Sequence, residues 1–203
     1  MKKKYIYIFL AATVFLAFLV WLFIESSKPL PGTKVTDLGR EHVPIGEKVE
    51  YNSNPPTSGK HYAEWVKSGV YTEPKDDRNL LHSLEHGYVI MSYNCDKPPA
   101  TGFIPQVLAH GTEEATPSSE ATPSANLSEN FRSDDCHKLV DQLISIYEKK
   151  GKNKLIVVPR ENLDSNFALT AWTYLDKFNE FDQNRIEKFI DAYLNMGPEK
   201  TME

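Results

Sequence analysis

Hydrophobic positions divide the chain into one unbroken apolar run and a longer part of mixed periodicity. Residues 5–24 form a stretch of twenty positions without a charged side chain. At about 1.5 Å rise per residue, a helix of this length crosses the ~30 Å hydrocarbon core of a bilayer. The pattern therefore predicts a transmembrane helix within residues 1–24.

The residues that flank this run predict its orientation. Lys2, Lys3 and Lys4 precede it, and no lysine follows in the first few residues after it. The positive-inside bias then leaves the N-terminus in the cytoplasm and the rest of the chain outside the cell membrane. Trp21-Leu22-Phe23-Ile24-Glu25 lacks the small residues of a signal-peptide cleavage site, so we expect an uncleaved single-pass anchor. A cleaved signal is the alternative, and it leads to the same compartment.

The part beyond the anchor is predicted to form one domain with an insert. Residues 25–32 contain two prolines and small polar residues, which are typical of a tether. Residues 33–203 have the usual size of a single domain, here extracytoplasmic. Residues from about 97 to 132 are rich in Pro, Ser, Thr and Ala and contain a near-repeat of Glu-Ala-Thr-Pro-Ser, so we expect a disordered insert there.

The periodicity inside the domain predicts its fold class. The clearest patterns indicate a helix from Asp76 or Asp77 to His86, strands over 88–94, 155–158 and 167–174, and helices over 135–150 and 183–194. Weaker patterns favour extended edge segments within 35–51 and one helical turn within 62–67. Because a strand-helix-strand unit favours parallel neighbours, we expect an α/β fold with a small mixed sheet layered against helices.

Charge and cysteine content limit the partners of this domain. The chain has a formal net charge of −5, and without the three N-terminal lysines the outer part carries −8. Nucleic acid and anionic lipid both need a basic face, so neither is an expected partner. Cys95 and Cys136 are the two cysteines, and in an oxidising space we expect them to form a disulfide with a structural role.

Histidines supply the candidate chemistry. His82 and His86 are four residues apart and therefore share one face of the predicted helix, with Glu85 beside them. His42 and His61 lie on turn-rich segments that can fold back toward this pair. Neutral imidazole suits copper and zinc, so the sequence predicts a copper or zinc site with these five residues as ligands. Buried or capping histidines without a metal are the alternative.

Two further residues bear on the metal. Met91 is a weaker candidate ligand, and it favours copper if its side chain faces the site. His110 lies within the predicted insert, which cannot fix a ligand geometry, and we do not expect it to serve the site.

His82-Ser83-Leu84-Glu85-His86 also fits the His-x-x-Glu-His pattern of a zinc peptidase class in which the glutamate is the general base. Those motifs lie within longer helices, whereas Gly87 ends this helix directly after the second histidine. The sequence carries no Gly-x-Ser-x-Gly nucleophile motif either. An enzyme is therefore the less favoured interpretation.

Several motifs together resemble a known bacterial family. They are Gly39-Arg40-Glu41-His42-Val43, Tyr51 to Tyr62 with its Asn-Pro-Pro-Thr-Ser-Gly core, Gly69-Val70-Tyr71, His82 to Gly87 and Ala168-Leu169-Thr170-Ala171-Trp172. This order resembles the family called domain of unknown function 3105, over nearly all of residues 37–199 except the insert. The resemblance implies an anchored or secreted protein and brings no settled activity.

The resemblance also bears on individual residues. The four histidines 42, 61, 82 and 86 all lie inside motif blocks, which strengthens the metal hypothesis. This chain departs from the family pattern where it has Lys60 in place of a frequent Pro and Thr173 in place of a frequent Gly.

Three functions remain open at this point. The first is a membrane-anchored extracytoplasmic domain that binds one copper or zinc ion for metal handling or sensing. The second is a metal-dependent enzyme that uses the same cluster, with Glu85 as a proton acceptor. The third is a structural or interaction protein of the cell envelope without metal. No protein partner can be named from the sequence.

Overall fold

A computed structural model describes residues 2–26, 29–97 and 127–201, and they form two compact units, 1–30 and 31–203. The first unit holds helix α1 (Lys2–Ser26). Its stretch Tyr5–Phe23 has a mean hydropathy of 2.6 and is long and apolar enough to cross a membrane. A membrane anchor and a signal sequence both satisfy this criterion.

The second unit is built on one six-stranded mixed sheet with the order β1-β6-β5-β3-β4-β2. The strands are β1 (Thr33–Lys34), β2 (Gly69–Val70), β3 (Val89–Tyr93), β4 (Leu155–Pro159), β5 (Phe167–Ala171) and β6 (Tyr174–Phe178). Strand β4 pairs in parallel with β2 and β3, whereas β5 is antiparallel to both β3 and β6. The predicted α/β fold with a small mixed sheet is confirmed.

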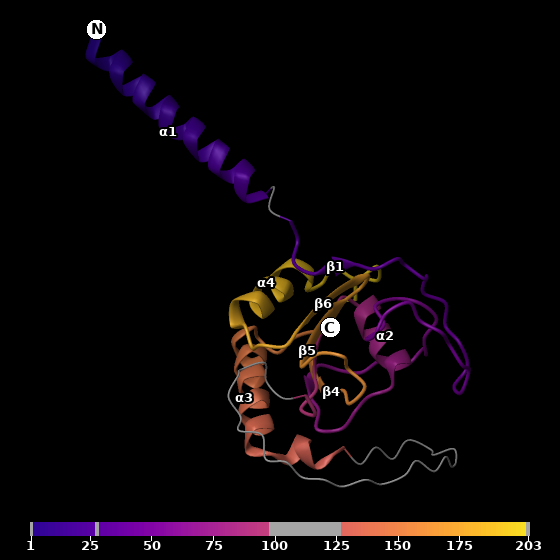
Figure 1. Cartoon of the computed structure of the whole chain (residues 1–203). Coiled ribbons are helices and arrows are strands. Elements are labelled where there is room, and N and C mark those ends of the chain that lie inside the picture. The colour runs from indigo at the N-terminus through magenta and orange to yellow at the C-terminus, as the bar shows by residue number, and fades with distance from the viewer. Residues whose placement is uncertain (1, 27–28, 98–126, 202–203) are drawn as a thin grey trace. The chain divides into compact units, whose positions relative to one another are not determined.

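Helices cover both faces of this sheet (Figure 1). Alternate residues of β3 point to opposite faces, so Val89 and Met91 pack toward α3 (Asp134–Lys149) and α4 (Gln183–Tyr193). Ile90, on the other face, packs with Leu81 and other residues of α2 (Asp77–Glu85). The result is a three-layer arrangement, with α2 on one face of the sheet and α3 and α4 on the other.

The sequence missed three strands. Strands β1 and β2 have two residues each, too few for a periodic pattern. The strand predicted over 167–174 is instead a hairpin of β5 and β6, with Trp172 and Thr173 at the turn. Thr173 has a φ of 62°, a conformation that favours glycine, and this explains why the turn was not visible in the sequence.

The predicted disulfide joins Cys95, after β3, to Cys136 in α3, with Cα atoms 5.6 Å apart. Most of the predicted insert, including His110, lies outside the described residues. The prediction of disorder is wrong for the last residues of the insert. Glu129–Arg132 form a short 3-10 helix, η1, and Phe131 is 7% exposed. A buried aromatic side chain holds this end of the segment against the core.

Two weak predictions differ from the structure. Residues 35–51 form no regular strand, and an isolated parallel bridge pairs His42 with His61 instead. Residues 62–67 form no helical turn. Their backbone runs along α2 and bonds to its side chains: Asn79 donates to the Glu64 carbonyl, and Ser83 Oγ both accepts from Val66 N and donates to its carbonyl.

Candidate metal centre

Helix α2 carries the first two histidines at its C-terminal end. The Asp76 side chain accepts a hydrogen bond from Arg78 N and so caps the start of the helix. His86 occupies the C-cap, and Gly87 follows with a φ of 83°, which ends the helix. His82 and His86 therefore share one face of the last turn, and their Nε2 atoms are 3.0 Å apart.

Backbone pairing brings the other two histidines together from separate loops. Val43 N donates to the His61 carbonyl, and His61 N donates to the Glu41 carbonyl. The preceding turn contains a cis peptide bond before Pro55, and Gly59 has a φ of 122° with the Tyr51 ring against it. The Asn-Pro-Pro-Thr-Ser-Gly turn thus leads directly to His61 within the domain.

Two backbone carbonyls orient the buried imidazoles. His61 Nδ1 lies 2.8 Å from the Gly59 carbonyl, and His82 Nδ1 lies 2.8 Å from the Tyr62 carbonyl. Since a carbonyl oxygen only accepts, both Nδ1 atoms carry the hydrogen and donate it. Each ring then presents Nε2 to the interior of the site, the tautomer selection that second-shell carbonyls provide in metal centres.

Three histidines converge to nearly the spacing of ligands on one ion. One ligand atom from each of His42, His61 and His82 lies within 4.8 Å of the other two. Two nitrogens bound to one zinc ion at about 2.0 to 2.1 Å are at most about 4.2 Å apart, so small side-chain rotations suffice to close the set. His61 is fully buried, whereas the His42 side chain is 49% exposed and gives the site contact with solvent.

Glu85 faces the same point. Its Oε2 lies 2.8 Å from His61 Nε2 and 3.9 Å from His42 Nε2, and its side chain is 4% exposed. Lone pairs face each other across the His61–Glu85 contact, so one proton or one cation must lie between the two atoms. Between the Nε2 atoms of His82 and His86, 3.0 Å apart, a neutral His86 with its hydrogen on Nε2 donates to His82. A cation can replace the proton at either contact.

The electrostatic surroundings favour the ligand form of His82. Burial lowers the pKa of His82 from its usual 6.5, and the neighbouring His86, His61 and His42 lower it further, against a raising effect from the Tyr62 carbonyl. A metal ion binds only the neutral imidazole, so this shift lowers competition from protons. Arg40 Nη1 approaches Glu85 Oε1 to 3.5 Å with a side chain 58% exposed.

Two tryptophans border the cluster. The Trp65 ring centroid lies 5.7 Å from that of His82 and 5.1 Å from that of His86. Trp172 packs edge-on against His61 at 6.3 Å. Both indole rings exclude water from one side of the imidazoles, and both are fluorescent reporters adjacent to the site.

Sequence reasoning missed one residue of the cluster. Glu199, from the segment after α4, lies 3.9 Å from His86 Nε2 and forms a second group of three candidate ligands with His82 and His86. A lone glutamate in a C-terminal Gly-Pro-Glu-Lys segment has no local pattern that reveals this contact. Glu85, by contrast, pairs with His61 and Arg40.

The remaining candidates lie away from the cluster. Met91 is fully buried in the core under α3 and α4, on the sheet face opposite α2, so the argument for copper from this residue is wrong. His137 is exposed on α3. It provides a histidine outside the site for comparison.

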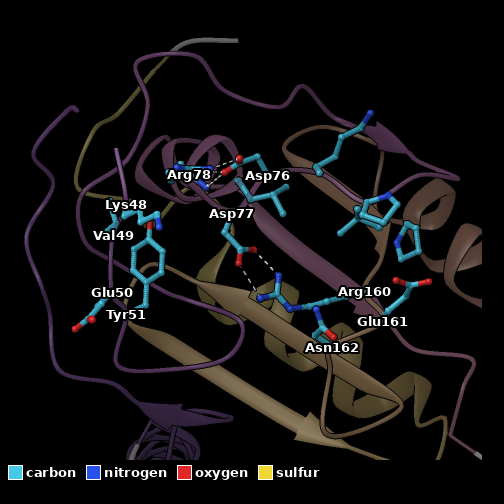
Figure 2. Close-up of a pocket in the computed structure, with 15 residues that line it drawn as sticks. Lys48, Val49, Glu50, Tyr51, Asp76, Asp77, Arg78, Arg160, Glu161 and Asn162 are labelled. Carbon is cyan, nitrogen blue, oxygen red and sulfur yellow. Dashed lines mark hydrogen bonds and ion pairs between the residues drawn. The ribbon is translucent and has the colours of Figure 1, made fainter. Parts of the chain in front are cut away.

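A groove of about 720 Å³ beside the start of α2 is a different kind of surface (Figure 2). Its guanidinium groups are already paired: Arg160 bonds both carboxylate oxygens of Asp77, and Arg78 bonds Asp76. Pairing within the wall satisfies these charges, and for this reason the histidine cluster is the stronger candidate site.

Comparison with known proteins agrees with the resemblance found in the sequence. The family model described as "Protein of unknown function (DUF3105)" matches residues 42–131 and 130–203, which is most of the chain and includes all the histidines of the cluster. Searches of curated proteins and of solved structures returned no match.

Proposed function

The chain belongs to the DUF3105 family of proteins of unknown function, and we propose that it is a membrane-anchored extracytoplasmic domain that binds one copper or zinc ion for metal handling or sensing. The ligands are His42, His61 and His82, with Glu85 beside them and His86 against His82. The observation that carries this proposal is the fixed tautomer of two buried imidazoles, whose Nε2 atoms face the same interior point as a buried carboxylate.

The location outside the cytoplasm rests on two features. The apolar helix near the N-terminus provides the anchor, preceded by the lysines that favour a cytoplasmic N-terminus. The disulfide between Cys95 and Cys136 suits an oxidising compartment. An ion bound there is available to the periplasm or cell exterior.

Metal analysis of the full chain in detergent tests the proposal. We expect about one equivalent of copper or zinc after dialysis, and its loss in a His61→Gln variant. His42→Ala, at a half-exposed position, lowers affinity while leaving the fold intact. His137→Ala on α3 is the matched control and binds like the wild type.

The two other functions of the cluster predict different results. A metal-free envelope protein binds no equivalent of either ion, and its His42→Ala and His137→Ala variants behave alike. A metal-dependent enzyme binds the ion and also turns over a substrate in hydrolase or oxidase screens, with activity lost on Glu85→Gln.

A further inference from the structure

The cluster contains two groups of three candidate ligands that share one residue. His42, His61 and His82 form the first, and His82, His86 and Glu199 form the second. His82 Nδ1 is engaged by the Tyr62 carbonyl, so His82 has only Nε2 to offer. One nitrogen lone pair binds one ion at a time, so the two groups cannot each hold an ion at the same time.

The two groups reach solvent at different places. The first does so at His42, from the segment before the Asn-Pro-Pro turn, with a side chain 49% exposed. The second does so at Glu199, from the C-terminal segment, with a side chain 50% exposed. Between them His82 is buried, with its side-chain Nε2 3.0 Å from His86 Nε2.

The C-terminal segment that carries Glu199 is fixed in place beside α2. Asn195 N donates to the Gly87 carbonyl and Glu199 N donates to the Glu85 carbonyl. Gly197 lies so close that a Cβ there would come within 2.2 Å of the Glu85 carbonyl oxygen. Lys154 Nζ, itself buried, donates to the carbonyls of His86 and Thr201 and holds the two segments together.

Building on the proposed function, we propose that the ion occupies two adjacent positions in turn. An outer position is formed by His82, His86 and Glu199, and an inner one by His42, His61 and His82 with Glu85. In the step between them the bonds from the ion to Glu199 and His86 break and bonds to His61 Nε2 and His42 form, while the bond to His82 is retained and the proton between His61 Nε2 and Glu85 passes to solvent. The oxidation state of the ion does not change.

The chemistry of the two ligand sets gives the direction of binding. The inner set offers three imidazoles and a buried carboxylate, which suit copper and zinc better than two imidazoles and one exposed carboxylate. The ion therefore rests at the inner position, and Glu199 acts during uptake and release. Removal of Glu199 is expected to change rates more than the equilibrium.

Stopped-flow fluorescence of the full chain in detergent tests this proposal. Cu²⁺ is mixed with the protein and quenching of the tryptophans beside the cluster reports uptake; EDTA then reports release. We expect Glu199→Gln to slow both rate constants by about tenfold, comparable to the smaller effects seen when residues that support a metal site are removed, with a much smaller change in Kd. Gly197→Ala displaces the same segment without removing a ligand, and it should reproduce the slowing. Glu180→Gln, an exposed position after β6, is the charge-matched control.

Two outcomes would overturn the two-position proposal while leaving the proposed function intact. Rate constants for Glu199→Gln equal to those of Glu180→Gln would remove the outer position. A loss of affinity in Glu199→Gln as large as that in His61→Gln would make Glu199 a ligand of the resting site instead. Failure of the wild-type chain to bind Cu²⁺ or Zn²⁺ at all would overturn the proposed function itself.

Discussion

The two faces of the sheet bury different chemistry. Under α3 and α4 the buried side chains are mainly apolar, as at Met91, Leu143 and Phe189, and the buried carboxylate of Asp176 is paired with Arg185 of α4. On the face of α2, the buried set includes His61, His82 and Glu85. Apolar burial stabilises a fold by about 25 cal/mol per Å², whereas buried polar pairs contribute little net free energy because desolvation offsets their attraction. The comparison indicates that the face under α3 and α4 supplies most of the stability of the domain, while the face of α2 carries the candidate metal site.

A cavity on the apolar face should have the largest effect on stability and none on metal binding. Leu143 is fully buried in α3, and Leu143→Ala is expected to lower the free energy of unfolding by about 3 to 5 kcal/mol. Urea unfolding measures this loss, and a Zn²⁺ titration of the folded variant measures affinity. A large change in affinity would show that the two faces are coupled, contrary to the comparison.

On the α2 face, removal of one polar partner should cost more than removal of both. His61→Leu leaves the carboxylate of Glu85, 3% exposed, without its 2.8 Å partner, and we expect a loss of about 3 kcal/mol. His61→Leu combined with Glu85→Leu should regain most of that stability, and neither variant should bind metal. A double variant as unstable as the single one would mean that this pair is itself part of what holds the fold.

The same division explains what the sequence could predict. Helices α3 and α4 and strands β3 and β4 have periodic apolar patterns that each segment carries by itself, and their positions were predicted within one or two residues. Of the site, the spacing of His82 and His86 was equally local. The elements of the apolar face can thus be predicted from the sequence because each repeats the spacing of its apolar residues over several positions.

The remainder of the site depends on contacts that no local pattern encodes. His42 reaches the cluster through an isolated bridge to His61, and Glu199 reaches it from the C-terminal segment. The segment 62–67 is irregular because side chains of α2 satisfy its backbone groups, which no propensity scale includes. These contacts join segments that lie far apart in the sequence, so sequence reasoning named candidate ligands without being able to arrange them.

The helix that carries the site has a pH-dependent cap. Hydrogen bonds from Arg78 lower the pKa of Asp76, so the folded protein holds the carboxylate more strongly charged than the unfolded chain does. This stability is present above the unfolded pKa of about 3.9 and is lost as pH falls through the lower folded value. Asp76→Ala should cost about 1 kcal/mol at pH 7.

Asp76→Asn isolates the charge, since asparagine still caps a helix. We expect its difference from the wild type, measured by urea unfolding from pH 7 downward, to shrink as pH falls below about 4. The control is Asp135→Asn, which makes the same change at an exposed side chain in the first turn of α3, on the other face of the sheet. A difference for Asp76→Asn that stays constant through this range would show that the charge of the cap does not contribute.

The smallest effect is expected at the turn between β5 and β6, where this chain has Thr173 at a φ of 62°. A left-handed conformation costs a residue with a Cβ about 1 to 2 kcal/mol, and glycine avoids this cost. Glycine also makes the unfolded chain more flexible, which lowers stability by about 0.5 to 1 kcal/mol. Thr173→Gly should therefore stabilise the domain by about 0.5 kcal/mol. Both backbone hydrogen bonds of the residue, to Thr57 and from Val35, need no side chain and are retained. Thr170→Gly within β5 lacks that gain and should destabilise the domain. Urea unfolding measures both variants. Equal losses of stability would mean that packing of the Thr173 side chain, 7% exposed, contributes more than its backbone conformation costs.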